Sequence, residues 1–195
     1  MKPRVGIIGK GNVGSSIKRG LERVGYQVKT VGNDRNGVRE TASWAEVIIL
    51  AVPFNALDNV LDEMGDGANG KVLVDATNVY TLEMMSVVGS KSGAEILQGK
   101  APGARVVKAF NSHFAKNMET GHIAGQQLSF FIAGDDKEAK QKVLELGSDL
   151  GFDPVDCGPL QNAKLVESLG NLGISLGYGM GMGQDIGFKL VRAKP

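Results

Sequence analysis

The most constraining feature of the sequence is a glycine-rich turn between an apolar strand and an amphipathic helix. The segment RVGIIGKGNVGSSI has the pattern G-x-G-x-x-G at Gly9, Gly11 and Gly14. Residues 4–8 are typical of a buried strand, and residues 12–24 are typical of a helix with one apolar face. In this setting the first glycine permits a tight turn, the second admits a pyrophosphate, and the third allows close packing of the helix. We therefore predict a dinucleotide-binding loop, with an ordinary glycine-rich turn as the alternative.

Apolar runs and amphipathic stretches alternate along the rest of the chain. Further strands are expected at residues 27–31, 46–51, 71–76, 105–110, 128–133 and 154–156. Helices are expected at residues 55–64, 92–97 and 135–150, and from about residue 160 the pattern is helical and then glycine-rich. This alternation predicts an α/β fold, a Rossmann-type open and mainly parallel sheet with a small C-terminal helical extension. We expect residues 1–157 to form the dinucleotide-binding core and residues 158–195 to pack on the same domain.

Polar residues follow several of the expected strands. Ligands of open α/β sheets bind at the carboxyl ends of the strands. The candidates for such a crevice are Ala51, Val52 and Pro53, Thr77 and Asn78, and Phe110, Asn111 and Ser112. The amides of Asn78 and Asn111 can hold a carboxamide or a ribose, and ordinary loop chemistry is the alternative.

The stretch VGNDRNG sets an acid beside a base after the second expected strand. Asp34 lies 20 residues beyond Gly14, near the spacing expected for the residue that reads the adenosine ribose. An aspartate there accepts hydrogen bonds from a free 2′-hydroxyl and favours NAD, whereas Arg35 can neutralise a 2′-phosphate and favours NADP. We predict NADP, because Arg35 can turn toward a phosphate while Asp34 points away, and NAD stays open.

The sequence offers no conventional catalytic group. No Tyr-x-x-x-Lys pair or G-x-S-x-G elbow occurs, Cys157 lies in an apolar setting, and His113 is a lone loop histidine. With only two histidines and one cysteine, no metal site is expected. Hydride transfer between two cofactors needs neither an acid nor a base from the protein, which must bind the two rings face to face and exclude water. We therefore predict cofactor-binding residues and no catalytic residue.

Composition excludes several partners. The net charge is +1, which gives no electrostatic reason to expect nucleic acid or an anionic membrane. The apolar run near the N-terminus covers only residues 5–8, so it is not a signal peptide. The single cysteine excludes an internal disulfide and is compatible with a reducing compartment. We expect a soluble, cytoplasmic protein with small-molecule partners.

Several longer motifs resemble a known family. They are GKGNVG, AVPF, DATN, VVKAFN, AGDDKEAK, GFDPVDCGPLQNAKLVESL and GMGQDIGFKL. Together they resemble the NADPH:coenzyme F420 oxidoreductases and the related cytosolic reductase domain of the STEAP metalloreductases, over nearly the whole chain. GPLQNAKLVESL and GMG followed by GFKL are typical of the deazaflavin branch, whereas VVKAFN is more similar to the STEAP branch.

The resemblance implies a reaction and the residues that carry it. Hydride would pass between NADP(H) and coenzyme F420 or a flavin-like acceptor, in a homodimer. The coenzyme would contact Lys10, Gly11, Asn12 and Val13 at the pyrophosphate, Asn33, Asp34 and Arg35 at the 2′ position, and Val52 and Pro53 along its length. Asn111 stands where the F420 reductases tend to have histidine, and Gly181, Met182 and Gly183 would help close the acceptor site.

Three other functions stay open. The first is a flavin or ferric reductase of the STEAP-like branch. The second is a small-substrate dehydrogenase or imine reductase with Lys164 as its helix lysine, although Glu167 and Ser168 stand where that type has asparagine. The third is a non-catalytic dinucleotide sensor, which binds coenzyme without turnover.

Overall fold

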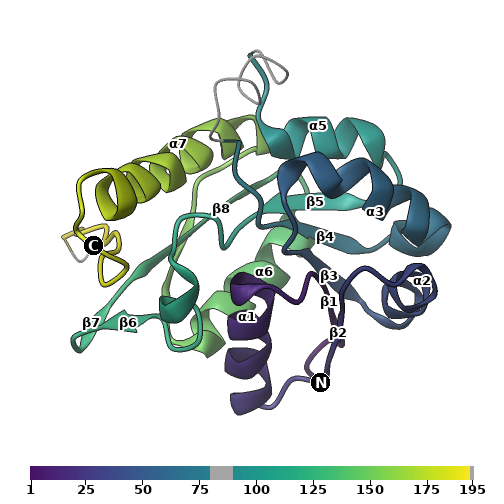
Figure 1. Cartoon of the computed structure of the whole chain (residues 1–195), viewed down its shortest axis with the longest axis horizontal. Coiled ribbons are helices and arrows are strands. Elements are labelled where there is room, and N and C mark those ends of the chain that lie inside the picture. The colour runs from purple at the N-terminus through teal and green to yellow at the C-terminus, as the bar shows by residue number, and fades with distance from the viewer. Residues whose placement is uncertain (80–89, 194–195) are drawn as a thin grey trace.

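The apolar runs form a seven-stranded sheet in the order β2-β1-β3-β4-β5-β8-β9 (Figure 1). The computed structural model describes residues 1–79 and 90–193. The strands are β1 (Val5–Ile8), β2 (Val28–Val31), β3 (Val47–Leu50), β4 (Val72–Asp75), β5 (Arg105–Lys108), β8 (Ser129–Gly134) and β9 (Asp153–Asp156). The first five are parallel, β8 is antiparallel to β5, and β9 is parallel to β8. The predicted Rossmann-type, mainly parallel α/β fold is confirmed.

Helices cover both faces of the sheet. One face packs against α1 (Asn12–Arg23) and α6 (Lys137–Leu150). The other face packs against α2 (Arg35–Trp44), α3 (Leu57–Met64), α5 (Gly93–Lys100) and α7 (Ala163–Ile174). The connections carry the 3-10 turns η1 (Phe54–Ala56), η2 (Gly65–Ala68), η3 (Ala115–Asn117) and η4 (Leu160–Asn162), the hairpin β6 (His122–Ile123) and β7 (Gln126–Gln127), and the π-helical turn η5 (Ser175–Gly179).

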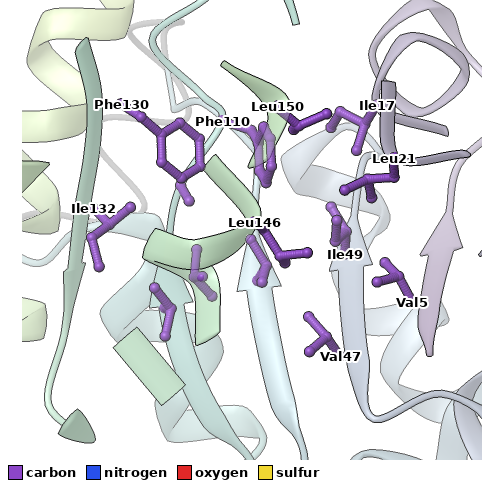
Figure 2. Packing of buried hydrophobic residues seen from close by; sticks show 14 of the residues in the cluster. Val5, Ile17, Leu21, Val47, Ile49, Phe110, Phe130, Ile132, Leu146 and Leu150 are labelled. Carbon is purple, nitrogen blue, oxygen red and sulfur yellow. The ribbon is translucent and has the colours of Figure 1, made fainter. Parts of the chain in front are cut away.

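The central strands are apolar at consecutive positions because both of their faces are buried. Figure 2 shows side chains of α1 and α6 packed on β1 and β3, with Ile17 and Leu150 close together. Phe110 and Phe130 close the core toward β8, with ring centroids 4.7 Å apart in an edge-to-face arrangement. The core therefore fixes the strand ends from which the candidate site residues emerge.

Two elements were missed by the sequence analysis. Residues 32–45 were treated as a connection, yet they contain the ten-residue helix α2. Only Val38, Thr41 and Ala42 of α2 are buried, and Gly37 in its first turn has a low helix propensity, so the segment was not recognised as a helix. The hairpin β6–β7 was also missed, since its two-residue strands are too short to show a period. The helix expected at residues 92–97 is present as α5, and Ser92 and Glu95 form a reciprocal capping box at its start.

The topology places a crevice at one edge of the sheet. The strands β2 and β3 flank β1, so the chain crosses over in opposite directions on either side of it. Such a switch point leaves a crevice at the carboxyl ends of the strands. Because β8 runs in the opposite direction, its first residue, Ser129, lies at that same edge and holds the C-terminal tail through Ser129 N–H to Phe188 O at 3.0 Å.

Candidate functional site

The glycine loop crosses from β1 to α1 at the switch point. A Cβ on Gly9 would lie 2.1 Å from the carbonyl oxygen of Ala51, and the φ angle of Gly9 is +121°. A Cβ on Gly14 would lie 2.0 Å from the carbonyl oxygen of Gly9. A Cβ on Gly11 would meet nothing within 4 Å, so this glycine faces open space. The loop thus has two glycines that packing requires and one whose surface is free for a ligand.

The start of α1 can receive an anion. Gly11 occupies the N-cap position and offers no side chain to the first turn. The N–H groups at the start of a helix lack intrahelical partners, and the helix dipole adds positive potential there. This backbone arrangement matches that of pyrophosphate-binding loops.

A cavity of about 250 Å³ opens beside the first turn of α1. Its lining contains five of the predicted residues: Asn12, Val13, Asn78, Asn111 and Ser112. It also contains residues that the sequence analysis did not propose, namely His113, Phe114, Ala115, Gly170, Gly173, Ile174, Tyr178 and Gln184. The cavity therefore joins the glycine loop, the ends of β4 and β5, and α7.

Two asparagines bind each other on the floor of this cavity. The Nδ2 of Asn111 donates to Asn78 Oδ1 at 3.0 Å and to Val166 O at 3.0 Å, and Asn78 Nδ2 donates to Asn111 O at 2.9 Å. A backbone carbonyl only accepts, so the Val166 contact fixes which way the Asn111 amide points. Among the described residues, Asn111 Oδ1 has no hydrogen-bond partner although it is buried. This oxygen is a free acceptor for an N–H or O–H donor.

A strained residue sets the direction of Asn111. Phe110 has a φ of 65°, in the left-handed region that bulky side chains rarely adopt. Such a conformation costs about 1–3 kcal/mol and persists where the surroundings enforce it. The buried contact between Phe110 and Phe130 supplies that enforcement and turns the next residues toward the cavity.

His113 is a buried, neutral imidazole in the wall of the cavity. Its ring packs beside Phe130 and Phe152, at centroid distances of 6.5 Å and 4.8 Å. Burial lowers the pKa of His113 to about 4, and the backbone of Ser129 opposes this effect only in part. Neither ring nitrogen makes a well-formed hydrogen bond within the described ranges. The nearby Ser112 Oγ is likewise buried without a partner there.

The residues predicted to surround the ribose lie at the end of β2. Asn33, Asp34 and Arg35 are exposed, and Arg35 is the first residue of α2. The Asp34 carboxylate folds back over α2, since its Oδ2 would lie 2.7 Å from a Cβ on Gly37. The aliphatic part of Lys10 lies over Gly32, with Cδ 3.6 Å from the corresponding Cβ position. The Lys10 side chain thus reaches the end of β2, close in the chain to the start of α2 at Arg35.

The other predicted residues lie outside the main cavity. Ala51, Val52 and Pro53 follow β3 at the carboxyl edge, and Ala51 N–H donates to Ile8 O at 2.8 Å. Met182 lines a smaller cavity of about 80 Å³, which shares Ser112 and Phe114 with the larger one. Gly181 and Gly183, on either side of Met182, are exposed.

Two further observations bear on the alternatives. Lys164 is exposed and donates to the backbone oxygen of Ser90 at 3.2 Å, so it does not point into the main cavity. Burial raises the pKa of Cys157. Within residues 1–79 and 90–193, no three His, Cys, Asp or Glu side chains gather as a metal site, and every helix is too short or too polar to cross a bilayer.

The sheet order and the glycine loop at its switch point define a Rossmann-type α/β protein. Residues 37–79 match the family model described as NADP oxidoreductase, coenzyme F420-dependent. The chain is 34% identical to Metalloreductase STEAP3 of Rattus norvegicus over 182 residues, which cover 86% of this chain and 36% of that protein. It is 31% identical to the F420-dependent NADP reductase of Methanothermobacter marburgensis over 150 residues, which cover 70% of this chain and 65% of that one.

A solved structure extends the comparison to the whole fold. A protein from Arthrobacter sp. fb24, proposed to be an F420-dependent NADP reductase, superposes with a TM-score of 0.87 at 26% identity, covering 97% of this chain and 100% of that chain. The chain is thus similar both to coenzyme F420-dependent NADP reductases and to STEAP metalloreductases, as the motifs predicted. It spans only about a third of the length of the metalloreductases that it matches, 36% and 35%.

Proposed function

We propose that this protein is an oxidoreductase that moves hydride between NADP(H) and coenzyme F420 or a flavin-like acceptor. The observation that carries the proposal is the cavity where the glycine loop meets the asparagine floor. Among the described residues that line it, none is a carboxylate, lysine, arginine or cysteine. A site of this kind works by binding and orienting two rings and excluding water.

The coenzyme would lie across the carboxyl edge of the sheet. Its pyrophosphate fits against Gly11 and the first N–H groups of α1, where Lys10, Asn12 and Val13 follow the same loop. Its carboxamide NH₂ can donate to Asn111 Oδ1, the buried acceptor that lacks a partner in the described chain. Asn78 orients that acceptor, and Val52 and Pro53 would border the coenzyme between its two ends.

The charges at the end of β2 support NADP over NAD. Arg35 and Lys10 can both reach a 2′-phosphate there, whereas the Asp34 carboxylate is turned toward Gly37. A guanidinium binds phosphate through charge-assisted hydrogen bonds. NADP is therefore the proposed coenzyme, and the ratio of NADPH to NADH turnover tests it.

The acceptor would enter from the side of α7 and the C-terminal tail. Phe114 and Tyr178 meet edge to face there, with ring centroids 5.5 Å apart, and Ile174 adds apolar surface. Flat apolar walls of this kind suit a deazaflavin or flavin ring. Met182, with Gly181 and Gly183, would border the acceptor beside Ser112.

The protein's own side chains would contribute by orienting the nicotinamide ring and excluding water. Nicotinamide would supply the hydride when it is bound, and the proton that completes reduction would come from solvent to a ring nitrogen of the acceptor, so the chain need supply none at the atom that receives the hydride. Asn111 would fix the rotation of the ring that carries the carboxamide. His113, which burial keeps neutral, would exclude water from the wall of the site without adding charge.

The outer surface of α7 supports a homodimer. Leu165 and Leu172, seven residues apart on one side of the helix, are 68% and 49% exposed. Tyr178, Met180 and Met182 follow the helix in the chain and are also exposed. Exposed apolar side chains that gather on a globular domain mark an interaction site.

Light scattering tests the dimer. Leu172→Glu is expected to convert a dimer at micromolar concentration into a monomer, while Glu145→Gln on the exposed side of α6 leaves the mass unchanged. A monomeric parent protein at the same concentration would refute the proposal.

One specific observation favours the second candidate, a flavin or ferric reductase. It is the 34% identity to a metalloreductase, which is higher than the 31% identity to an F420-dependent reductase. Both candidates fit a reducing compartment such as the cytoplasm, in which Cys157 stays a thiol.

Anaerobic turnover separates these functions. NADPH and NADH are each offered with oxidised coenzyme F420, with FMN, and with a ferric chelate. Rapid reduction of F420 is the expected result. Turnover only with FMN or ferric chelate would favour the second candidate, and tight coenzyme binding without any turnover would indicate a sensor.

A further inference from the structure

A lysine is completely buried beneath the floor of the cavity. Lys108 is the last residue of β5, and the sheet register pairs it with Asp75, the last residue of β4. Its side chain has 0% exposure. Its Nζ donates to Asp75 Oδ2 at 3.0 Å and to Thr77 O at 2.5 Å, and lies 3.1 Å from Glu167 Oε1 on α7. The three N–H donors of the ammonium therefore each have an acceptor.

The two carboxylates are bound in turn to the backbone. Asp75 Oδ1 accepts from Thr77 N–H at 2.9 Å. Glu167 accepts from Gly93 N–H at 3.1 Å and from Ala94 N–H at 3.3 Å, both in the first turn of α5. The network of Asp75, Lys108 and Glu167 thus joins β4, β5, α5 and α7 through charge-assisted hydrogen bonds.

Each member of this network is close in the sequence to Asn78, to Asn111 or to the residue that binds Asn111. Asp75 precedes Asn78 by three residues, and Lys108 precedes Asn111 by three residues. Glu167 follows Val166, whose carbonyl oxygen fixes the Asn111 amide.

The backbone of α7 meets the pair one turn further on. A Cβ on Gly170 would lie 2.8 Å from both Asn111 Nδ2 and Asn78 Oδ1. A shift of α7 would therefore move both the Val166 acceptor and the surface that covers the amides.

We propose that Lys108, together with Asp75 and Glu167, is a positioning residue that holds α7 against the asparagine pair and thereby aims Asn111 Oδ1 into the cavity. A buried ion pair is often no more stabilising than well-packed apolar side chains. The contribution of this network is to fix the position of α7 and the orientation of the Asn111 amide, since each of its hydrogen bonds has a fixed donor and a fixed acceptor. Its effect on hydride transfer rests on the proposed function, whereas its effect on the amide pair does not.

Three variants remove the network in graded ways. Lys108→Met removes the ammonium at similar volume. The triple variant Asp75→Asn, Lys108→Met, Glu167→Gln removes all three charges together, so no carboxylate is left unpaired if the single variant fails to fold. Glu167→Gln is the mildest change, because it keeps the size and shape of the side chain. It still weakens the network, because its one amide oxygen cannot accept from all three donors that the carboxylate binds.

A matched control breaks a different ion pair. Lys140→Met removes the contact of Lys140 Nζ with Asp156 Oδ2 at 2.9 Å, between α6 and β9. Neither residue lines the main cavity.

Two readouts separate positioning from simple loss of stability. The first is hydrogen exchange of the Asn111 side-chain NH₂ by NMR, well below the melting temperature. The Asn117 side-chain NH₂, which donates to Gln184 O at 3.0 Å, is the internal reference. The second is kcat for NADPH oxidation beside the Kd of ADP-ribose, a probe without the nicotinamide ring.

The triple variant is expected to exchange the Asn111 amide about tenfold faster while Asn117 is unchanged. Its kcat should fall about tenfold to a hundredfold, with the Kd of ADP-ribose within about twofold of the parent value. The Lys140→Met protein should match the parent in both readouts. Unchanged Asn111 exchange in the folded triple or Glu167→Gln variant would overturn the proposal, whatever the melting temperature. A parent without turnover would refute the proposed function, and the exchange result would still decide this one.

Discussion

Mild acid is expected to destabilise this protein through His113. Burial lowers the pKa of the folded imidazole to about 4, against 6.5 for an exposed histidine. Between these values the unfolded chain binds more protons than the folded one, so the free energy of unfolding rises with pH. The stability is therefore fully present above pH 6.5 and is lost as the pH falls toward 4. The whole difference is about 3 kcal/mol, of which about 2.5 kcal/mol is lost by pH 4.5.

Urea unfolding at pH 7.5 and pH 4.5 measures this loss. His113→Leu replaces the imidazole with an apolar group beside Phe130 and Phe152, and its loss of stability between the two pH values should be about 2.5 kcal/mol smaller than that of the parent. His122→Gln changes an exposed histidine and should keep the parent's pH dependence. If the His113→Leu protein lost as much stability as the parent between the two pH values, the assignment of a buried, neutral imidazole would be wrong.

Three further substitutions test the proposed coenzyme site. In fluorescence titrations, Arg35→Ala should weaken the binding of NADPH by roughly 1.5–3 kcal/mol and leave the binding of NADH nearly unchanged. Equal losses of affinity for the two coenzymes would contradict a phosphate contact. Gly11→Ala should keep the parent's melting temperature but weaken both coenzymes, whereas Gly14→Ala should lower the melting temperature, because its Cβ would lie 2.0 Å from a carbonyl oxygen. Gly170→Ala should lower kcat more than coenzyme affinity, because its Cβ displaces the asparagine pair, and an unaffected kcat would show that the pair does not orient the ring.

The fold could be predicted because its strands are buried on both faces. The run EVIILA is apolar at consecutive positions, and β3 forms within it at Val47–Leu50 with every residue buried. The same pattern located β1, β4 and β5. By contrast, α2 has charged residues at its start and in its middle and a glycine in its first turn, and it is helical because Val38 and Ala42 pack on the sheet. Tertiary packing, which a local pattern does not contain, decides such a segment.

Five of the thirteen described residues that line the cavity could be predicted, for a topological reason. Asn78 and Asn111 follow parallel strands, whose carboxyl ends must meet at one edge. Which helix covers that edge depends on the path of the chain after β9, so Gly170 and Ile174 carried no recognisable signal. His113 was discounted as a lone loop histidine, since nothing next to it in the sequence shows that Phe130 and Phe152 will enclose it.

The buried ion network did leave a signal that the sequence analysis did not use. VLVDA and VVKAF each break an apolar strand with one charge, of opposite sign, at the same distance from a later asparagine. In adjacent parallel strands those two charges fall in register, as Asp75 and Lys108 do. An unpaired charge cannot remain in such a strand, so its partner must lie on the neighbouring strand or on the covering helix. A site that works by orienting its ligands needs the side chains on its floor to point in one fixed direction. A charged residue at a strand end, three residues before an asparagine, can hold the backbone from which that asparagine projects.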